Sequence, residues 1–117
     1  ISSLKYFEKP LILNSSNKND FIYIDDVCRA IMAAIKKKNI YGTFNIGSGN
    51  TISVEEIYKK ILLKMNLNKK IFQLSKKNNK KSKANFADLK NVCSKLKWQP
   101  KIKIDNGIEK TINFYNG

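Results

Sequence analysis

The sequence of 117 residues has no histidine, one arginine and only two cysteines. Without histidine the chain cannot build a Ser-His-Asp triad, and we expect no zinc site either. Cys28 and Cys93 are far apart in the sequence, and each falls on the apolar side of an expected helix. We therefore expect both to be reduced core residues, as in a cytoplasmic protein, with a disulfide or a metal pair as the alternative.

Long apolar runs and acidic residues are also scarce. No run of about 18 uncharged apolar residues occurs, so we expect no membrane-spanning segment. Nine acidic residues stand against 23 lysines and arginines, which gives a net charge of +14. Such a charge alone would suggest a nucleic acid or an anionic membrane surface as the partner. Nearly all the cations are lysines, whereas nucleic-acid recognition favours arginine forks, so we expect neither partner.

The stretch from Asn19 to Gly49 predicts a strand, a helix, a turn and a second strand. Residues 21–24 are apolar or aromatic, as in a buried strand, and Asp25 or Asp26 can cap the helix that follows. A glycine turn then leads to residues 43–46, which are again β-prone. The predicted helix carries its apolar residues on one face, at Val27, Ala30, Ile31, Ala34 and Ile35.

A second helix is expected to begin near Val54, because Ser53 and Glu56 can form a capping box. It should end at Asn66 or Asn68. The alternation of strands and helices along the chain is that of an α/β protein. The other expected elements are the end of a helix at 1–9, strands at 11–13 and 71–74, a helix that Asp88 caps and that ends near Trp98, an extended piece at 102–104, and a last helix after Asp105 with Ile108, Ile112 and Tyr115 facing inward.

Two motifs resemble a known family. They are residues 20–27, with the sequence DFIYIDDV, and residues 44–49, with the sequence FNIGSG. Together they resemble the C-terminal part of the extended short-chain dehydrogenase/reductases, which are NAD-dependent epimerases, dehydratases and reductases of nucleotide sugars. Residues 96–100, LKWQP, are similar to the family's Leu-Gly-Trp-x-Pro. Lys97 then stands where glycine ends a helix in the left-handed conformation, and we expect Trp98 to be a core anchor.

The resemblance implies that residues 1–117 form the substrate-binding C-terminal portion of such an enzyme. The fold class would be α/β, a partial Rossmann-type arrangement with short mixed strands and about four helices. The N-terminal half that binds NAD or NADP in the parent enzyme would be absent from this chain.

The residues needed for cofactor binding and catalysis are missing from the sequence. The only glycine cluster, Gly47-Ser48-Gly49, has Ile52 where a dinucleotide fingerprint needs its third glycine. We therefore interpret these glycines as turn residues. The family's Tyr-x-x-x-Lys pair does not occur after any of the five tyrosines. We expect no catalytic residue, no bound cofactor and no metal in this chain alone.

The candidate substrate-binding residues are Asn19, Asp20, Lys77 and Asn78. In the family an Arg-Asp-Phe motif places an arginine on the diphosphate of the substrate, and Asn19 stands at that position here, so Lys18 could supply the charge instead. Lys77 and Asn78 fall where the epimerases have a second phosphate-binding arginine. They lie in a lysine-rich stretch, residues 75–83, which is either a solvated loop or an anion-binding loop.

The sequence thus predicts the substrate-binding portion of a nucleotide-sugar epimerase, dehydratase or reductase of carbohydrate biosynthesis, cytoplasmic and not catalytic by itself. Its partners would be the nucleotide sugar and the missing N-terminal cofactor domain, and the parent enzyme could be a homodimer. Two alternatives remain open. One is a basic module that binds RNA or single-stranded DNA, and the other is a non-catalytic remnant that pairs its helices with another chain.

Overall fold

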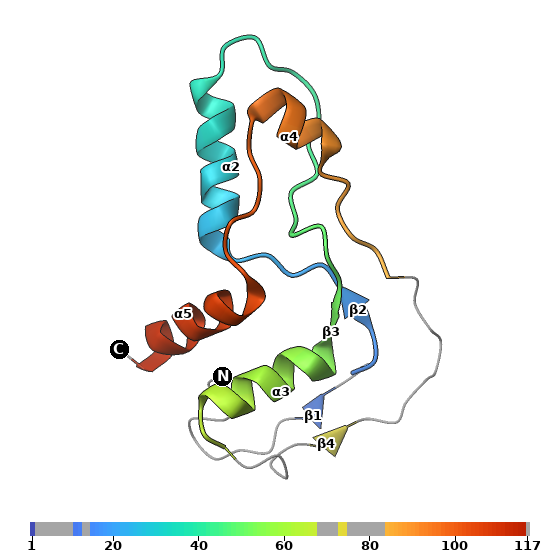
Figure 1. The fold of residues 1–117 in the computed structure, drawn as a ribbon, viewed down its shortest axis with the longest axis vertical. Helices are drawn as coiled ribbons and strands as arrows, with labels where there is room; N and C mark the ends of the chain where they lie inside the picture. The colour runs from blue at the N-terminus through green and yellow to red at the C-terminus, as the bar shows by residue number, and fades with distance from the viewer. Residues whose placement is uncertain (2–10, 13–14, 68–72, 75–83, 117) are drawn as a thin grey trace.

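The structure is a computed structural model that describes residues 1, 11–12, 15–67, 73–74 and 84–116. Its principal-axis extents are 52 × 38 × 16 Å. Viewed down the shortest axis, none of the described helices lies over another, so the helices form a single layer (Figure 1). Within the described residues the elements are β1 (Leu11–Ile12), β2 (Lys18–Asn19), α2 (Ile24–Lys36), β3 (Ile52–Ser53), α3 (Val54–Lys64), β4 (Gln73–Leu74), α4 (Lys90–Leu96) and α5 (Ile104–Asn116).

The helices form two pairs, which Figure 1 shows one above the other. The pair α2 and α4 lies at the top, and the pair α3 and α5 lies at the bottom. Long extended segments connect the pairs and run between them. We call residues 21–50 and 84–103 the α2–α4 half, and residues 51–67 and 104–116 the α3–α5 half.

The strands form two small ladders rather than one sheet. Strand β1 pairs with β4 in parallel, and β2 pairs with β3 in antiparallel fashion. The expected strands at 11–13 and 71–74 are therefore confirmed where they are described. Residues 21–23 and 43–46, by contrast, are not strands, and helix α2 already begins at Ile24. Both segments contain β-prone residues, but no strand pairs with either of them in the described part of the chain.

The core of the α2–α4 half surrounds Trp98, which is 3% exposed and packs with Ala30, Val92 and Leu96. The expectation that Trp98 is a core anchor is confirmed. Cys93 packs against this core, and both cysteines are free thiols.

The predicted inward face of α2 is wrong in part. Ile31 and Ile35 are 54% and 71% exposed, and Cys28 is also exposed rather than in the core. The physical reason is that α4 and its flanking segments cover α2 only from the Ala30 side. The residues left uncovered form a stripe at helical spacing, which we call the apolar stripe: Ile24, Cys28, Ile31 and Ile35.

Apart from the start of α4, described below, the ends of the helices follow the sequence with one exception. The capping box of Ser53 and Glu56 is present, and Asn66 ends α3 with φ of 54°. Lys97 ends α4 in the left-handed conformation, with φ of 55°. The exception is α2, whose N-cap is Tyr23 with no side-chain cap. Neither aspartate of the motif caps this helix, because both lie inside its first turn.

The prediction that Asp88 caps α4 is wrong, because the helix begins one residue later and its N-cap is Leu89, with no side-chain cap. The carboxylate of Asp88 accepts a hydrogen bond of 3.0 Å from the N–H of Lys90, the first residue of the helix. In the α3–α5 half, Leu62, Ile108 and Ile112 are buried between the two helices. Tyr115, which was expected to face inward, is 47% exposed because α5 extends past its neighbour near its end. The expected helix end at 1–9 lies almost wholly outside the described residues.

Candidate functional site

Asp20 is the residue that ties the first motif to the second. Its carboxylate accepts hydrogen bonds from the N–H and hydroxyl of Ser48, at 2.7 and 2.5 Å, and from the N–H of Gly49 at 3.0 Å. The same carboxylate accepts a fourth bond of 3.0 Å from the N–H of Ala87. One side chain therefore joins three segments that are far apart in the sequence. We call this arrangement the Asp20 clamp.

The clamp explains two features of its surroundings. Partial burial alone would raise the pKa of Asp20, but the hydrogen bonds from Ser48, Ala87 and Gly49 outweigh it and hold that pKa below its usual value. Gly47 lies so close that a Cβ there would be 2.5 Å from Asp20 Oδ2 and 2.6 Å from the Cβ of Ala87. Gly47 is thus needed for a close approach, while Gly49, with φ of 75°, is a turn glycine as expected.

The candidate substrate residues are only partly placed by the structure. Asn19 is exposed at the end of β2, where it pairs with Ile52 and forms an isolated parallel bridge to Asn85. Asp20 follows it directly. Lys77 and Asn78 lie outside the described residues. The site assignment of these four residues stays a prediction.

A cavity of about 670 Å³ with a mixed polar and apolar lining opens beside the Asp20 clamp. Its lining includes Lys18 of β2, Ser48 of the second motif and Asn50. Residues 100–105 also line it, and they include two more lysines, at 101 and 103. The cavity is large enough for part of a nucleotide-sized ligand.

The structure gives Asp26 a role in holding the fold together that the sequence did not reveal. Its side chain is fully buried, and its carboxylate accepts bonds of 3.0 and 2.9 Å from the N–H groups of Lys101 and Ile102. The guanidinium of Arg29 also pairs with it. Its backbone carbonyl accepts a bond of 3.0 Å from the indole N–H of Trp98. Asp26 therefore fixes residues 98–102 against the start of α2.

Burial raises the pKa of Asp26, but the bonds from Ile102, Arg29 and Lys101 outweigh this effect and leave the pKa below its usual value. Both clamping aspartates are thus ionised at neutral pH and fully engaged with donors. Neither is suited to transfer protons. The sequence signal that could have singled out Asp26 was weak, since two adjacent aspartates at a helix start usually act as caps.

The described residues hold neither a metal site nor a membrane span. No group of three or more histidine, cysteine, aspartate or glutamate side chains gathers in the described ranges. Nor does any helix there have the length and apolar character needed to cross a membrane. The arrangement can hold chain segments together and offer cations and amides to a ligand.

Comparison with known proteins defines the family. Residues 3–111 match the family model for GDP-mannose 4,6 dehydratase. The chain belongs to this family of extended short-chain dehydrogenase/reductases, the NAD-dependent epimerases and dehydratases of nucleotide sugars. It is 32% identical over 113 residues to the UDP-glucuronate 4-epimerase of Thermodesulfobacterium geofontis, covering 93% of this chain and 34% of that one. The chain spans about a third of the length of the curated relatives it matches.

Solved structures show the same fold. The dTDP-glucose 4,6-dehydratase of Bacillus anthracis, in complex with NAD, matches with a TM-score of 0.85 and 19% identity. The match covers 98% of this chain and 37% of that one. The UDP-glucose 4-epimerase of Thermotoga maritima, with UDP-glucose, gives a TM-score of 0.84 and 24% identity over 97% of this chain and 37% of that one. The predicted fold class, a partial Rossmann-type α/β arrangement, is confirmed.

Proposed function

We propose that this chain is the substrate-binding portion of an NAD(P)-dependent nucleotide-sugar epimerase, dehydratase or reductase, and that it is not catalytic alone. The observation that carries the proposal is that nearly the whole chain matches the family while its residues include neither the glycine fingerprint nor the Tyr-x-x-x-Lys pair. The missing groups would come from an N-terminal half that binds NAD or NADP.

The uncovered surface of the α2–α4 half supports the proposal that an N-terminal half packs against it. The apolar stripe leaves large side chains uncovered, including Ile35 at 71% exposure. Residues 43–46 are β-prone and extended but unpaired among the described residues. Stable domains bury their apolar faces between at least two layers, and this chain is about one layer thick. We infer that the stripe and residues 43–46 pack against the N-terminal half. That the parent enzyme is a homodimer stays a prediction.

The substrate would lie at the loops that the Asp20 clamp holds. Asn19 can offer an amide to the diphosphate, Lys18 lines the adjacent cavity as a point charge, and Lys77 and Asn78 would approach from residues 75–83. Asp20 itself is saturated with donors from the protein. We therefore propose that Asp20 positions the loops that touch the substrate.

Two measurements test this function. Calorimetric titration of the purified chain with NAD should give no binding, and tight NAD binding would overturn the proposal. Reading the coding sequence upstream of Ile1 should reveal a glycine fingerprint followed by a Tyr-x-x-x-Lys pair. An upstream start codon without these motifs would instead identify a non-catalytic remnant.

A further inference from the structure

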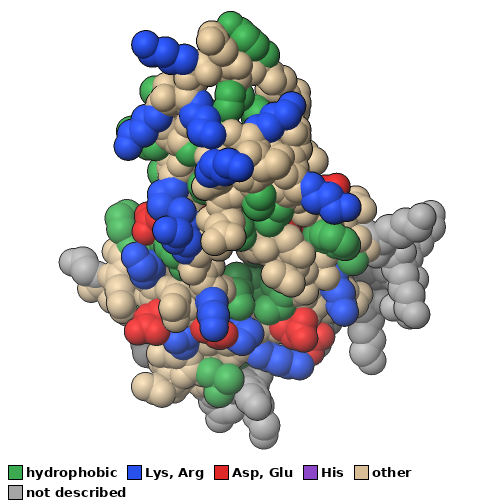
Figure 2. All heavy atoms as spheres, turned by 45° about the horizontal axis from the view of Figure 1, so that its top comes forward, with side chains coloured by type: hydrophobic (Ala, Val, Ile, Leu, Met, Phe, Trp, Pro, Cys, Tyr) green, Lys and Arg blue, Asp and Glu red, His purple; other side chains and the backbone are tan. Residues whose placement is uncertain are grey.

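The charges of the described residues are distributed unevenly between the two halves. The α3–α5 half carries four lysines and four carboxylates, whereas the α2–α4 half carries nine lysines and arginines and only three aspartates. Asp26, one of these three, is buried. Figure 2 shows lysine and arginine side chains spread over the upper part of the molecule and the largest acidic patches in the lower part. The excess positive charge is therefore concentrated on one half.

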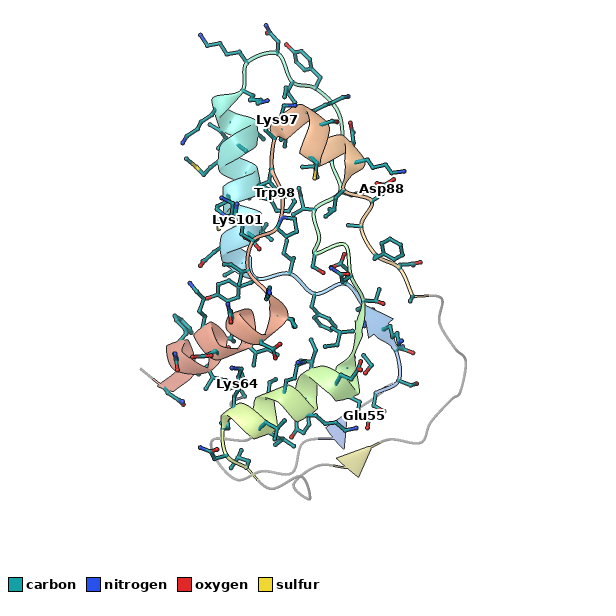
Figure 3. The ribbon with its side chains drawn as sticks, in the orientation of Figure 1. Glu55, Lys64, Asp88, Lys97, Trp98 and Lys101 are labelled. Carbon is teal, nitrogen blue, oxygen red and sulfur yellow. The ribbon has the colours of Figure 1, made fainter. Side chains whose placement is uncertain are left out.

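A groove on the α2–α4 half gathers four of these cations. It lies between α2, α4 and residues 97–101, with a volume of about 640 Å³. Figure 3 shows Lys97, Trp98 and Lys101 along the segment that descends beside α2. Among its lining residues there is no carboxylate. The lining comprises the cations Arg29, Lys36, Lys97 and Lys101 and, between them, Met32, Ala33, Cys93, Trp98 and Gln99. We call this feature the cationic groove.

Three of the four cations have no partner in the described part of the chain. Within the described residues no hydrogen bond or ion pair engages the ammonium groups of Lys36, Lys97 and Lys101. Arg29, by contrast, is held by Asp26 and donates to the carbonyl of Gln99 at 3.3 Å. Neighbouring unpaired ammonium groups repel one another, so an anion in the groove would be favoured.

The spacing of the cations suits an elongated anion. Arg29 and Lys36 are seven residues apart, about 10 Å along the axis of α2. Lys97 and Lys101 are four residues apart on the opposite wall, about 13 Å if that segment is extended. Two rows of charge thus face each other over about two turns of a helix.

The floor of the groove argues for a protein ligand rather than a nucleic acid. Single-stranded nucleic acids stack their bases on exposed aromatic rings, but the Trp98 ring is only 3% exposed. The one arginine is already occupied. The floor instead offers Ala33, Cys93 and the adaptable side chain of Met32, which is 50% exposed.

We propose that the cationic groove binds an acidic amphipathic helix of a partner protein. The apolar side chains of that helix would pack on Met32, Ala33 and Cys93, and its carboxylates would pair with Lys36 and Lys97. Lys101 also borders the cavity beside the Asp20 clamp, so the proposal does not require it. On α2 the groove residues lie about a third of a turn from the apolar stripe, at 100° per residue. Both surfaces can therefore be occupied at once, and the inference goes beyond the proposed function and does not depend on it.

The test uses the full chain and three labelled probes. The first is a synthetic amphipathic peptide of about 14 residues, or four helical turns, built from leucine and glutamate. The second is the same composition in scrambled order, and the third is a single-stranded RNA. Fluorescence anisotropy measures binding of each. We expect the amphipathic peptide to bind about tenfold more tightly than the scrambled one, and the RNA to bind more weakly still.

Variants locate the binding and separate it from folding. Lys97→Gly removes a cation at a left-handed position that glycine adopts without strain, so it should weaken peptide binding about tenfold without reducing the melting temperature. Lys36→Gln should act in the same direction. Lys59→Gln, in the α3–α5 half, is the matched control and should leave binding unchanged. Equal binding of the scrambled peptide, preferred binding of RNA, or unchanged affinity in Lys97→Gly would each overturn the proposal.

Discussion

The two halves of the molecule use their charged residues in opposite ways. In the α3–α5 half, Lys60 pairs with Asp105 at 2.7 Å and Lys64 with Glu109 at 2.8 Å. Exposed ions thus bridge the two helices. In the α2–α4 half Asp26 bonds mainly to backbone N–H groups, as does Asp20 just before it, and most of the lysines there are left for solvent or a ligand. Carboxylates that accept several backbone donors stabilise a fold more than exposed pairs do, because water and salt screen the exposed pairs. The comparison predicts that the α2–α4 half depends on single residues and that the α3–α5 half does not.

The largest effect is expected at Asp26. Asp26→Asn leaves buried donors from Lys101, Ile102 and Arg29 facing an amide, and should lower the free energy of unfolding by about 3 kcal/mol. Urea denaturation measures the change. Asp25→Asn is the matched control, because its exposed pair with Lys110 should contribute no more than about 0.5 kcal/mol. Equal effects of the two substitutions would contradict the assigned role of Asp26.

The next effect concerns the Asp20 clamp. Gly47→Ala places a methyl group against Asp20 Oδ2 and the Ala87 side chain, and should cost about 2 kcal/mol. Gly42→Ala is a useful comparison, since it changes a glycine with φ of 119° that has nothing within 4 Å. Thermal unfolding of both variants separates crowding from backbone strain. A Gly47→Ala protein as stable as the unsubstituted one would show that the clamp is not closely packed.

Acid should act mainly through Asp20 and Asp26. The pKa values of Glu56 and Asp105 in the α3–α5 half are also lowered, by Ser53 and Lys60, but water screens these exposed carboxylates. Asp20 and Asp26 have a lower pKa in the folded chain than their usual 3.8, so the unfolded chain binds more protons as the pH falls through this region. Stability contributed by these groups is present above about pH 4 and is lost below it. Denaturation curves between neutral pH and pH 3 should show this loss, and Asp26→Asn should flatten it. An unchanged pH dependence of stability in Asp26→Asn would contradict the assignment of the acid-induced loss to Asp26.

A substitution at Lys97 should have a smaller effect on stability, and of opposite sign. A non-glycine residue in the left-handed conformation costs about 1 kcal/mol, so Lys97→Gly should stabilise the chain by up to that amount. The melting temperature reports the change, and Lys95→Gly, inside α4, should lower it instead.

The smallest effect is expected in the α3–α5 half. Lys64→Gln removes the exposed pair with Glu109 and should change the free energy of unfolding by no more than about 0.5 kcal/mol. The difference should shrink further in high salt. A loss comparable to that of Asp26→Asn would erase the contrast between the halves.

The sequence by itself determined the local features and the family. The capping box at Ser53 depends on residues within a few positions of one another and was predicted correctly. Asn66 was one of two predicted ends of α3, and Lys97 takes the left-handed conformation that the resembling family motif gives to glycine. The paired motifs also identified the family and fold class. Helix caps and helix ends can be predicted from the sequence because the local backbone conformation restricts which residue types occur there.

Only the tertiary structure decided what the long-range partners were. Asp26 binds N–H groups 75 and 76 residues away, and Asp20 binds one 67 residues away, which no local pattern reveals. The strands expected at 21–24 and 43–46 failed because a strand needs a neighbour that its own sequence does not specify. The same holds for the exposed Ile31 and Ile35, since apolar spacing predicts a helix face but not which element covers it.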